Sequence, residues 1–368
     1  MRTSTRLWLT AALLLGSSTA SAQSLDSLKS ELKKLGDTGE FSGVVLVRKG
    51  GKTILHEAYG LASIAYKVPN TIDTRFNTAS VGKMFTAVSI GQLVEAGKLK
   101  WTDTLAKVLP DYPNKAQASK ITIHQLLTHT SGLGLYWDNL FKGNWTAVRT
   151  SQDLVPFFAD DTLLAPPGTA WNYSNTGYAV LALVIEKVSG ESYANYIQKH
   201  IFDVLGMKNT DYTALDVDIP NKATGYFREG PNAPLKNNLF THTVVGGGAG
   251  GGWISSGDLA TFAEGYMSGK LMSKATLAEM TKPHAKLPPP PGAGAGGPVP
   301  SYGYGTFVNT SNGKAVWGHT GGFPGIMTIL NMYPQTGDVM VVQSNNPNPA
   351  ARKVWQAVER LMSVPPGV

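Results

Sequence analysis

The 368-residue chain contains no cysteine. This absence excludes disulfide bonds, zinc sites built on thiolates and a cysteine nucleophile. Charged residues are scarce at 15% of the sequence, while hydrophobic residues reach 42%, which is typical of a globular protein. A chain of this length can bury a sizeable core without disulfides or metal ions.

The sequence also lacks a transmembrane segment after its N-terminal region. The N-terminal apolar run, residues 7–15, is too short to cross a bilayer comfortably. It follows Arg2 and Arg6 and precedes small residues that end in an Ala-Ser-Ala pattern. This arrangement predicts a signal peptide over residues 1–22 that is cleaved at its end. We expect an exported protein, periplasmic or secreted, without a stable membrane anchor.

No strong excess of one charge marks the chain as a nucleic-acid binder. The formal net charge is +7, and loss of the two arginines in the signal peptide leaves +5. Lysine and arginine are scattered, without a basic stripe interleaved with aromatic residues. We expect no nucleic-acid partner and at most a weak attraction to an anionic cell wall or membrane surface.

Strand patterns occupy both ends of the chain, and helical patterns occupy its middle. Leucines at helical spacing predict a first helix over residues 24–36, and residues 43–59 predict a β-hairpin. Further strands and a closing helix are predicted at 302–308, 315–319, 325–333, 339–344 and 349–362. This order predicts an α+β fold in which an antiparallel sheet, built from both chain ends, is flanked by the terminal helices. A mainly helical subdomain, roughly 80–210, is inserted into this single domain of residues 23–368.

A predicted helix over residues 80–97 begins with Ser80-Val81-Gly82-Lys83. Residues three apart share one face of a helix, so the Lys83 amine can lie beside the Ser80 hydroxyl. Free N–H groups at the helix start would favour negative charge on the serine oxygen. A buried lysine with a lowered pKa can accept the serine proton. The spacing is common by itself, and the alternative is a capping serine with a solvated lysine.

Tyr173-Ser174-Asn175 lies in a turn before a predicted helix over residues 176–189. It offers a phenol, a hydroxyl and an amide within three residues. A phenol near cations can act as a general base or relay a proton, and Asn175 can hydrogen-bond Lys83 or a substrate amide. The alternative is ordinary loop packing.

His319-Thr320-Gly321-Gly322 is predicted to end a strand and begin a turn. A strand edge there would present backbone groups to an extended substrate. The Gly322 N–H, together with that of Ser80, can form an oxyanion hole, and the glycines allow close approach of a substrate. The alternative is a structural histidine near a turn.

These three segments together resemble the motifs of the penicillin-recognising serine hydrolases, which include class C β-lactamases, D-peptidases and related esterases. The Ser80 segment is similar to the Ser-x-x-Lys motif, and the Tyr173 segment to the Tyr-x-Asn motif of the class C branch. His319-Thr320-Gly321 stands in the place of Lys-Thr-Gly. The flanking segments 126–133 and 250–262 also look like those of the family, so the resemblance covers about residues 38–362.

The resemblance implies a mechanism. Ser80 would attack a carbonyl to give an acyl-enzyme that water hydrolyses. Lys83 and Tyr173 would share the role of general base, and the sequence does not indicate which of them holds the proton. Asn175 would orient these groups. His319, Thr320 and Gly321 would contact the substrate, a small molecule or peptide for which cell-wall fragments are candidates. The resemblance implies neither a metal ion nor an organic cofactor, and the oligomeric state is not indicated.

His319 departs from the family's lysine. A lysine there is a permanent cation that binds a substrate carboxylate, whereas histidine is mostly neutral at pH 7. We therefore rank an esterase or a D-amino-acid peptidase or amidase above a class C-like β-lactamase. A penicillin-binding or sensor protein without turnover is the alternative of another class, and the intact Ser80, Lys83, Tyr173 and Asn175 argue against it.

Several other patterns carry weaker interpretations. The glycine run 246–252 contains a G-x-G-x-x-G match without a strand–helix–strand context, so no dinucleotide site is predicted. The Pro- and Gly-rich segment 284–300 is predicted to be a surface loop. His129 is interpreted as structural rather than catalytic. Three aromatic residues can line a cleft or equally pack in the core or at a rim, namely Tyr136, Trp137 and Trp171.

Overall fold

The computed structural model describes residues 24–230, 232–288, 300–311, 313–346 and 349–362. The predicted signal peptide, residues 1–22, lies outside the described residues, as does most of the Pro- and Gly-rich segment, at 289–299. Within the described ranges, no helix combines the length and the apolar character needed to cross a membrane.

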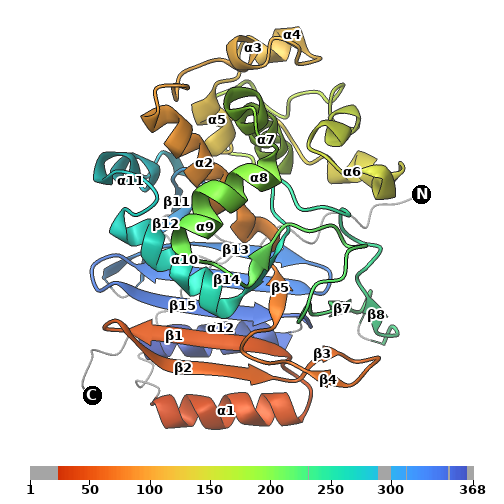
Figure 1. Cartoon of the computed structure of the whole chain (residues 1–368), viewed down its shortest axis with the longest axis vertical. Helices are drawn as coiled ribbons and strands as arrows, with labels where there is room; N and C mark the ends of the chain where they lie inside the picture. The colour runs from red at the N-terminus through yellow and green to blue at the C-terminus, as the bar shows by residue number, and fades with distance from the viewer. Residues whose placement is uncertain (1–23, 231, 289–299, 312, 347–348, 363–368) are drawn as a thin grey trace.

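An eight-stranded antiparallel sheet forms the centre of the molecule (Figure 1). Strands from the two chain ends meet in it, because β1 pairs with β15 on one side and with β2 on the other. The predicted sheet built from both ends is therefore confirmed. In spatial order the strands are β10 (Ala285–Lys286), β11 (Ser301–Tyr302), β12 (Phe307–Ser311), β13 (Lys314–Phe323), β14 (Ile326–Tyr333), β15 (Asp338–Ser344), β1 (Gly43–Lys49) and β2 (Lys52–Tyr59).

Two predicted strand boundaries are wrong. The strand predicted over residues 302–308 is divided into β11 and β12, because a turn with Gly305 at φ +69° separates them. β13 does not end at His319 but continues to Phe323. Gly321 and Gly322 stay extended because they pair with Thr328 and Met327 of β14. Glycine weakens a strand interior, but cross-strand pairing outweighs that effect here.

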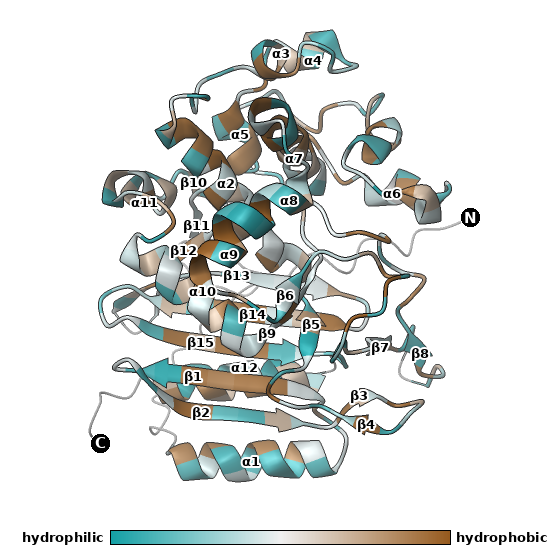
Figure 2. Cartoon of the chain, viewed as in Figure 1, coloured by the Kyte–Doolittle hydropathy of each residue, from teal (hydrophilic) through white to brown (hydrophobic). Residues whose placement is uncertain are grey.

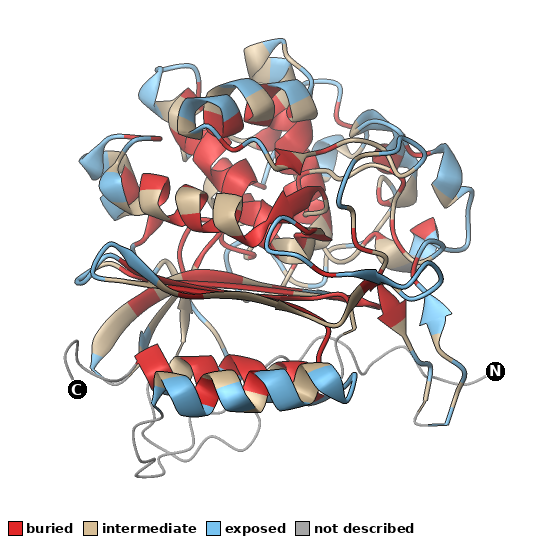
Figure 3. Ribbon diagram, turned by 60° about the horizontal axis from the view of Figure 1, so that its bottom comes forward, coloured by how far each residue is buried: buried red, intermediate tan, exposed pale blue. Residues whose placement is uncertain are grey.

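The two terminal helices, α1 (Leu25–Asp37) and α12 (Pro349–Met362), cover one face of the sheet. Residues along α1 alternate between apolar and polar (Figure 2), and the buried side of this outer layer faces the strands (Figure 3). Leu28 and Leu32 of α1 pack with Trp355 of α12 and with inward side chains of β1. Burial of an apolar stripe explains why both helices form and dock as predicted.

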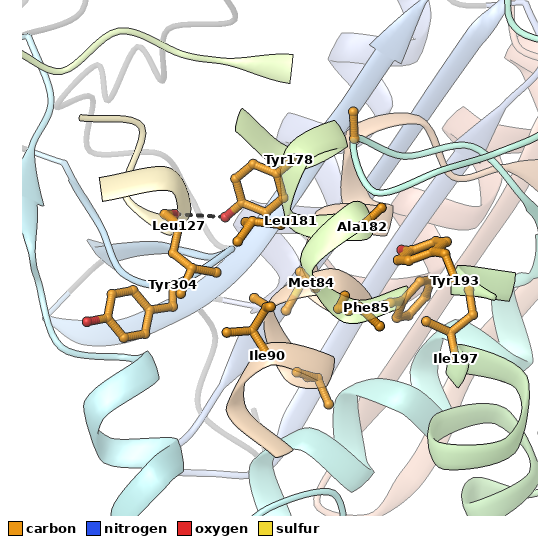
Figure 4. Close-up of a cluster of buried hydrophobic side chains, with 14 of the residues drawn as sticks. Met84, Phe85, Ile90, Leu127, Tyr178, Leu181, Ala182, Tyr193, Ile197 and Tyr304 are labelled. Atoms are coloured by element: carbon orange, nitrogen blue, oxygen red, sulfur yellow. Dashed lines mark hydrogen bonds between the residues drawn. The ribbon is translucent and has the colours of Figure 1, made fainter. Parts of the chain in front are cut away.

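The opposite face of the sheet carries α10 (Ser256–Ser268) and, beyond it, the helical part of the chain. At its centre lies α2 (Lys83–Glu95), ten of whose thirteen residues are buried. A helix that is apolar on all sides must lie inside a core. Figure 4 shows Met84, Phe85 and Ile90 of α2 packed with side chains of α7 (Asn175–Ser189) and α8 (Tyr193–Ile197). This packing fixes the start of α2, and Ser80 lies in the turn directly before it.

The remaining elements are short. The other helices are α3 (Leu105–Val108), α4 (Lys115–Ala118), α5 (Ile123–Leu127), α6 (Trp137–Leu140), α9 (Asp203–Leu205) and α11 (Lys274–Met280), with single turns η1 (Ala79–Gly82), η2 (Trp145–Ala147), η3 (Gln152–Phe157) and η4 (Gln198–Phe202). The small sheets are β3 (Leu61–Ser63) with β4 (Val68–Pro69), β5 (Arg75–Asn77) with β9 (Trp253–Ser255) and β6 (Thr210–Asp211), and β7 (Tyr226–Phe227) with β8 (Lys236–Asn237).

Candidate active site

Ser80 lies in the 3-10 turn η1, which leads into α2, and not in the first turn of an α-helix as predicted. Ala79 precedes it with φ +42°, a left-handed conformation that is costly for a residue with a Cβ. The Asn77 Oδ1 accepts the Ala79 N–H at 2.8 Å, and the Ala79 carbonyl accepts the Gly251 N–H at 3.2 Å. These bonds hold the turn in a strained shape that leaves Ser80 partly exposed.

The glycine run 246–252 lies directly against this turn and shapes it. Gly250 has φ +135°, and a Cβ there would lie 2.0 Å from the Ala79 carbonyl oxygen. Only glycine fits that position. The Gly252 carbonyl accepts the Thr78 N–H at 3.0 Å. The high glycine density was the sequence signal for this close approach.

Lys83 begins α2 and is fully buried. Its Nζ lies 3.1 Å from the Ser80 Oγ, 2.8 Å from the Asn175 Oδ1 and 2.6 Å from the Ala249 carbonyl oxygen. All three partners are uncharged. Burial without a countercharge lowers the pKa of Lys83 well below its ordinary value. The amine is therefore placed beside the serine hydroxyl in an environment that favours its neutral form.

Tyr173 lies beside both Ser80 and Lys83. Its ring centroid is 4.9 Å from the Lys83 Nζ. Burial raises the pKa of the Tyr173 phenol, and a hydrogen bond with Ser80 acts in the opposite direction. The balance favours the protonated phenol, which can donate or relay a proton.

Ser174, the hydroxyl between Tyr173 and Asn175, is structural. Its Oγ accepts the Gly177 N–H at 2.8 Å as the N-cap of α7 and donates to the Gly134 carbonyl at 3.0 Å. This cap sets the direction in which α7 begins. Asn175, the first residue of α7, is thereby presented to Lys83.

His129 brackets the peptide that carries Tyr173. Its backbone carbonyl accepts the Asn172 N–H at 2.8 Å, and its Nδ1 accepts the Ser174 N–H at 3.0 Å. Its ring lies over the Tyr173 ring, with centroids 4.4 Å apart and planes inclined by 34°. Burial, with Lys83 and His319 nearby, lowers the pKa of His129 well below its ordinary value. The sequence interpretation of a structural histidine missed this link to the reactive tyrosine.

His319 is almost completely buried, with 1% of its surface exposed. Its Nε2 lies 2.9 Å from the Tyr302 hydroxyl and its Nδ1 lies 2.7 Å from the Thr320 carbonyl oxygen. This geometry fits a neutral imidazole whose Nδ1–H donates to the carbonyl and whose Nε2 accepts from the phenol. Burial first, and then the charge of Lys83, lowers the pKa of His319 to about 3. The position therefore carries no cation near neutral pH.

The burial of His319 gives no support to the predicted contact between its ring and a substrate. Thr320 is partly buried and Gly322 is exposed, so these two are the accessible members of the segment. β12 pairs with β13 only as far as Gly318, and the strand edge beyond it is not paired by β12. Gly321 lies against η1, where an added Cβ would be 3.0 Å from the Ser80 nitrogen. This placement is compatible with the predicted oxyanion hole of the Ser80 and Gly322 N–H groups.

The three sequence motifs thus meet at one place between the sheet and the helical part. Lys83 contacts both Ser80 and Asn175, Tyr173 bonds to Ser80, and Gly321 packs on the backbone of η1. Among the residues that the structure describes, no group of three or more His, Cys, Asp or Glu side chains is arranged to hold a metal ion. The arrangement can activate a serine hydroxyl for attack on a carbonyl carbon.

The sequence and the fold of this chain are similar to those of known proteins. The Beta-lactamase family model matches residues 28–361. Penicillin-binding protein 4* of Bacillus subtilis (strain 168) is 32% identical over 333 residues, which cover 86% of this chain and 71% of that protein. A penicillin binding protein from Bacillus halodurans has TM-score 0.80 at 30% identity, covering 91% of this chain and 98% of that one. A D-stereospecific amidohydrolase from Streptomyces sp. has TM-score 0.75 at 26% identity, with the same coverage of 91% and 98%.

Proposed function

Since this chain belongs to the Beta-lactamase family of serine hydrolases, we propose that it hydrolyses ester or amide substrates through an acyl-enzyme on Ser80. The observation that carries the proposal is the 3.1 Å separation between the Ser80 Oγ and the Nζ of a buried Lys83 with uncharged partners. A structural relative described as a D-stereospecific amidohydrolase supports an amide carbonyl as a target.

Acylation begins with proton transfer from Ser80 to Lys83. A neutral amine has two N–H bonds, which the Asn175 Oδ1 and the Ala249 carbonyl accept. Its lone pair is then directed at the Ser80 hydroxyl and takes the proton as the Oγ–carbon bond forms. The carbonyl electron pair moves onto oxygen, where the N–H groups of Ser80 and Gly322 would stabilise the negative charge.

Collapse of this intermediate breaks the bond to the leaving group. The proton on Lys83 passes to the leaving oxygen or nitrogen, with the protonated Tyr173 phenol as the relay. Water then attacks the Ser80 ester, Lys83 accepts its proton, and the acid product departs with free Ser80 restored. The opposite pKa directions of the two groups support Lys83 as the base and Tyr173 as the proton relay.

The substrate class follows from the charge at His319. A neutral imidazole provides no cation for a substrate carboxylate, so we rank an esterase or D-amino-acid amidase or peptidase above a β-lactamase. We also propose that the protein is exported, on the signal-peptide pattern of residues 1–22.

A fluorophosphonate probe and a substrate panel test the proposal. We expect Ser80 labelling and turnover of p-nitrophenyl esters or D-amino-acid amides, with nitrocefin the slowest substrate. Lys83→Arg, which keeps a permanently protonated guanidinium, should lose about 10²–10⁴-fold in kcat/KM. Lys98→Arg, just beyond α2, is the matched control and should retain wild-type rates.

Labelling that persists in Ser80→Ala would contradict the assignment of the nucleophile. Stable labelling without turnover of any substrate would favour the penicillin-binding or sensor alternative.

A further inference from the structure

Five aromatic rings form a continuous surface beside the candidate active site, which we call the aromatic rim: Trp137, Phe141, Trp145, Phe240 and Phe323. We propose that the aromatic rim binds an apolar aryl or alkyl group of the substrate. This inference rests on the proposed serine hydrolase function and names the substrate class of the same site.

Ring contacts run through the whole set. The Trp137 ring lies 5.0 Å from the Phe323 ring and 5.6 Å from the Phe141 ring, to which it is nearly parallel at 11°. Phe141 then contacts Trp145 at 6.4 Å, and Trp145 contacts Phe240 edge-on at 6.3 Å. These are the separations of interacting aromatic pairs, so the rings form one surface and not isolated side chains.

The rim is assembled from segments far apart in the chain. Trp137 begins α6, Trp145 begins η2, Phe323 ends β13, and Phe240 follows the β7–β8 hairpin. α6 and this hairpin lie on the same side of the molecule (Figure 1). The Asn238 side-chain amide donates to the Pro324 carbonyl at 2.9 Å, which ties the Phe240 segment to the turn after β13.

One end of the rim, formed by Phe323 and Trp137, leads to the reacting groups. Phe323 directly follows Gly321 and Gly322, and Gly321 packs on the Ser80 backbone. At the same end, the Tyr136 ring lies 4.6 Å from the Trp137 ring. Burial, and then the nearby Tyr173, raises the pKa of Tyr136. A substrate carbonyl on Ser80 would therefore have the rim as its neighbouring surface.

The exposure of the rim distinguishes a binding surface from core packing. Phe240 is 76% exposed and Phe141 is 41% exposed, whereas core aromatics such as Phe85 are fully buried. Large apolar side chains gathered at a surface indicate a binding site. The neutral His319 nearby provides no attraction for an acid, so the occupant that fits is an uncharged apolar group. Each CH₂ buried on the rim would improve binding about fourfold.

Phe240→Ser tests the proposal, because so exposed a ring can be removed without opening the core. The assay compares p-nitrophenyl acetate with p-nitrophenyl hexanoate, and ethyl acetate with benzyl acetate. We expect the wild-type enzyme to prefer the larger member of at least one pair, and Phe240→Ser to lose about fivefold or more in kcat/KM for that member. The smaller esters should change less than twofold. Tyr66→Ser, which removes an 83% exposed ring on the β3–β4 hairpin, is the matched control and should change neither rate.

Equal rates of Phe240→Ser and wild type on every ester, with hydrolysis still dependent on Ser80, would overturn the aromatic rim while leaving the proposed function intact. The absence of any Ser80-dependent hydrolysis would instead remove the proposed function itself. Analytical sedimentation tests the alternative that the aromatic rim binds a second copy of this chain instead of a substrate. A wild-type oligomer that dissociates in Phe240→Ser without a change in ester selectivity would show a contact with a second copy, and would overturn the substrate role.

Discussion

Single side chains outside the reacting set control the geometry of those within it, and His129 is the clearest case. It occupies a left-handed conformation at φ +60° and donates no group to the reaction. Its carbonyl and its Nδ1 hold the N–H groups on either side of Tyr173. The position of the phenol beside Ser80 therefore depends on a neutral, acceptor-bearing residue at 129.

We predict that His129→Val lowers kcat more than tenfold, because it leaves the buried Ser174 N–H unpaired and places a β-branched residue at positive φ. His129→Asn should recover most of the activity, since asparagine tolerates this conformation and its Oδ1 can accept the same N–H. The measurement is the split between kcat and KM on one ester, with KM little changed.

His124→Asn is the control, since this histidine lies in α5, five residues before His129, but bonds to Tyr304. Equal loss in the Val and Asn variants of His129, together with equally lowered melting temperatures, would mean that the residue acts through stability alone.

Whole segments also set the geometry of the candidate site. The glycine run 246–252 sets the shape of η1. It has no side chains to offer, and it acts by allowing its backbone to approach Ala79 and to place the Ala249 carbonyl on Lys83. α12 illustrates the opposite case, because its docking partly buries Glu359, whose Oε1 accepts from the Asn331 amide at 3.1 Å. In both segments, packing sets the environment of a titratable side chain, Lys83 in one case and Glu359 in the other.

We predict that Gly250→Ala disrupts the nucleophile turn, because the new Cβ would meet the Ala79 carbonyl at 2.0 Å. A displacement of Ser80 by about 1 Å would cost about 10²-fold in kcat/KM. Gly247→Ala is the control from the same run, since nothing lies within 4 Å of its Cβ position. Similar activity in both variants would show that the close approach does not govern the turn.

We predict that wild-type stability declines as the pH rises from 5 to 8 relative to Glu359→Gln. Burial raises the pKa of Glu359 from 4.5 to about 7, so the folded state holds a proton that the unfolded state releases above pH 4.5. This contribution is complete below pH 4.5 and is lost as the pH rises through 7, a difference of about 2–3 kcal/mol. Urea unfolding of both proteins at pH 5 and pH 8 measures it. A constant difference between the two proteins at both pH values would contradict the prediction.

At the scale of the molecule, the sheet joins the two ends of the chain. Gly43 of β1 lies opposite Ser344 of β15, and the site forms where this sheet meets the helical part. The described fold begins at Ser24, whose hydroxyl caps α1, so a cut after residue 22 would leave α1 intact.

We predict that the exported protein begins at Gln23. N-terminal sequencing of the periplasmic or secreted form checks the cleavage site, and Ala22→Asp should block processing by placing a charge in the small-residue pattern. A chain that starts at Gln23 and is made without export is the control, and it should have full esterase activity. Recovery of the uncleaved chain from the cytoplasm would contradict the proposal.

Much of the fold was readable from the sequence because its signals are local. Apolar spacing predicted α1, α7 and α12 and the hairpin of β1 and β2 to within a few residues. The boundaries that failed, at Gly305 and after His319, depend on a turn conformation and on pairing with β14. The hydrophobic periodicity of residues 302–323 indicates neither this turn nor this pairing.

The sequence by itself determined which residues are candidates for the reaction, since Ser80, Lys83, Tyr173 and Asn175 stand in recognisable motifs. Only the tertiary structure decided which of these side chains are buried and which protonation state each one favours. Lys83 is basic in water and becomes a candidate proton acceptor because distant segments bury it and surround it with uncharged partners. His319 is buried and neutral for the same reason. Desolvation depends on contacts between residues up to hundreds of positions apart, and no local pattern in the chain specifies them.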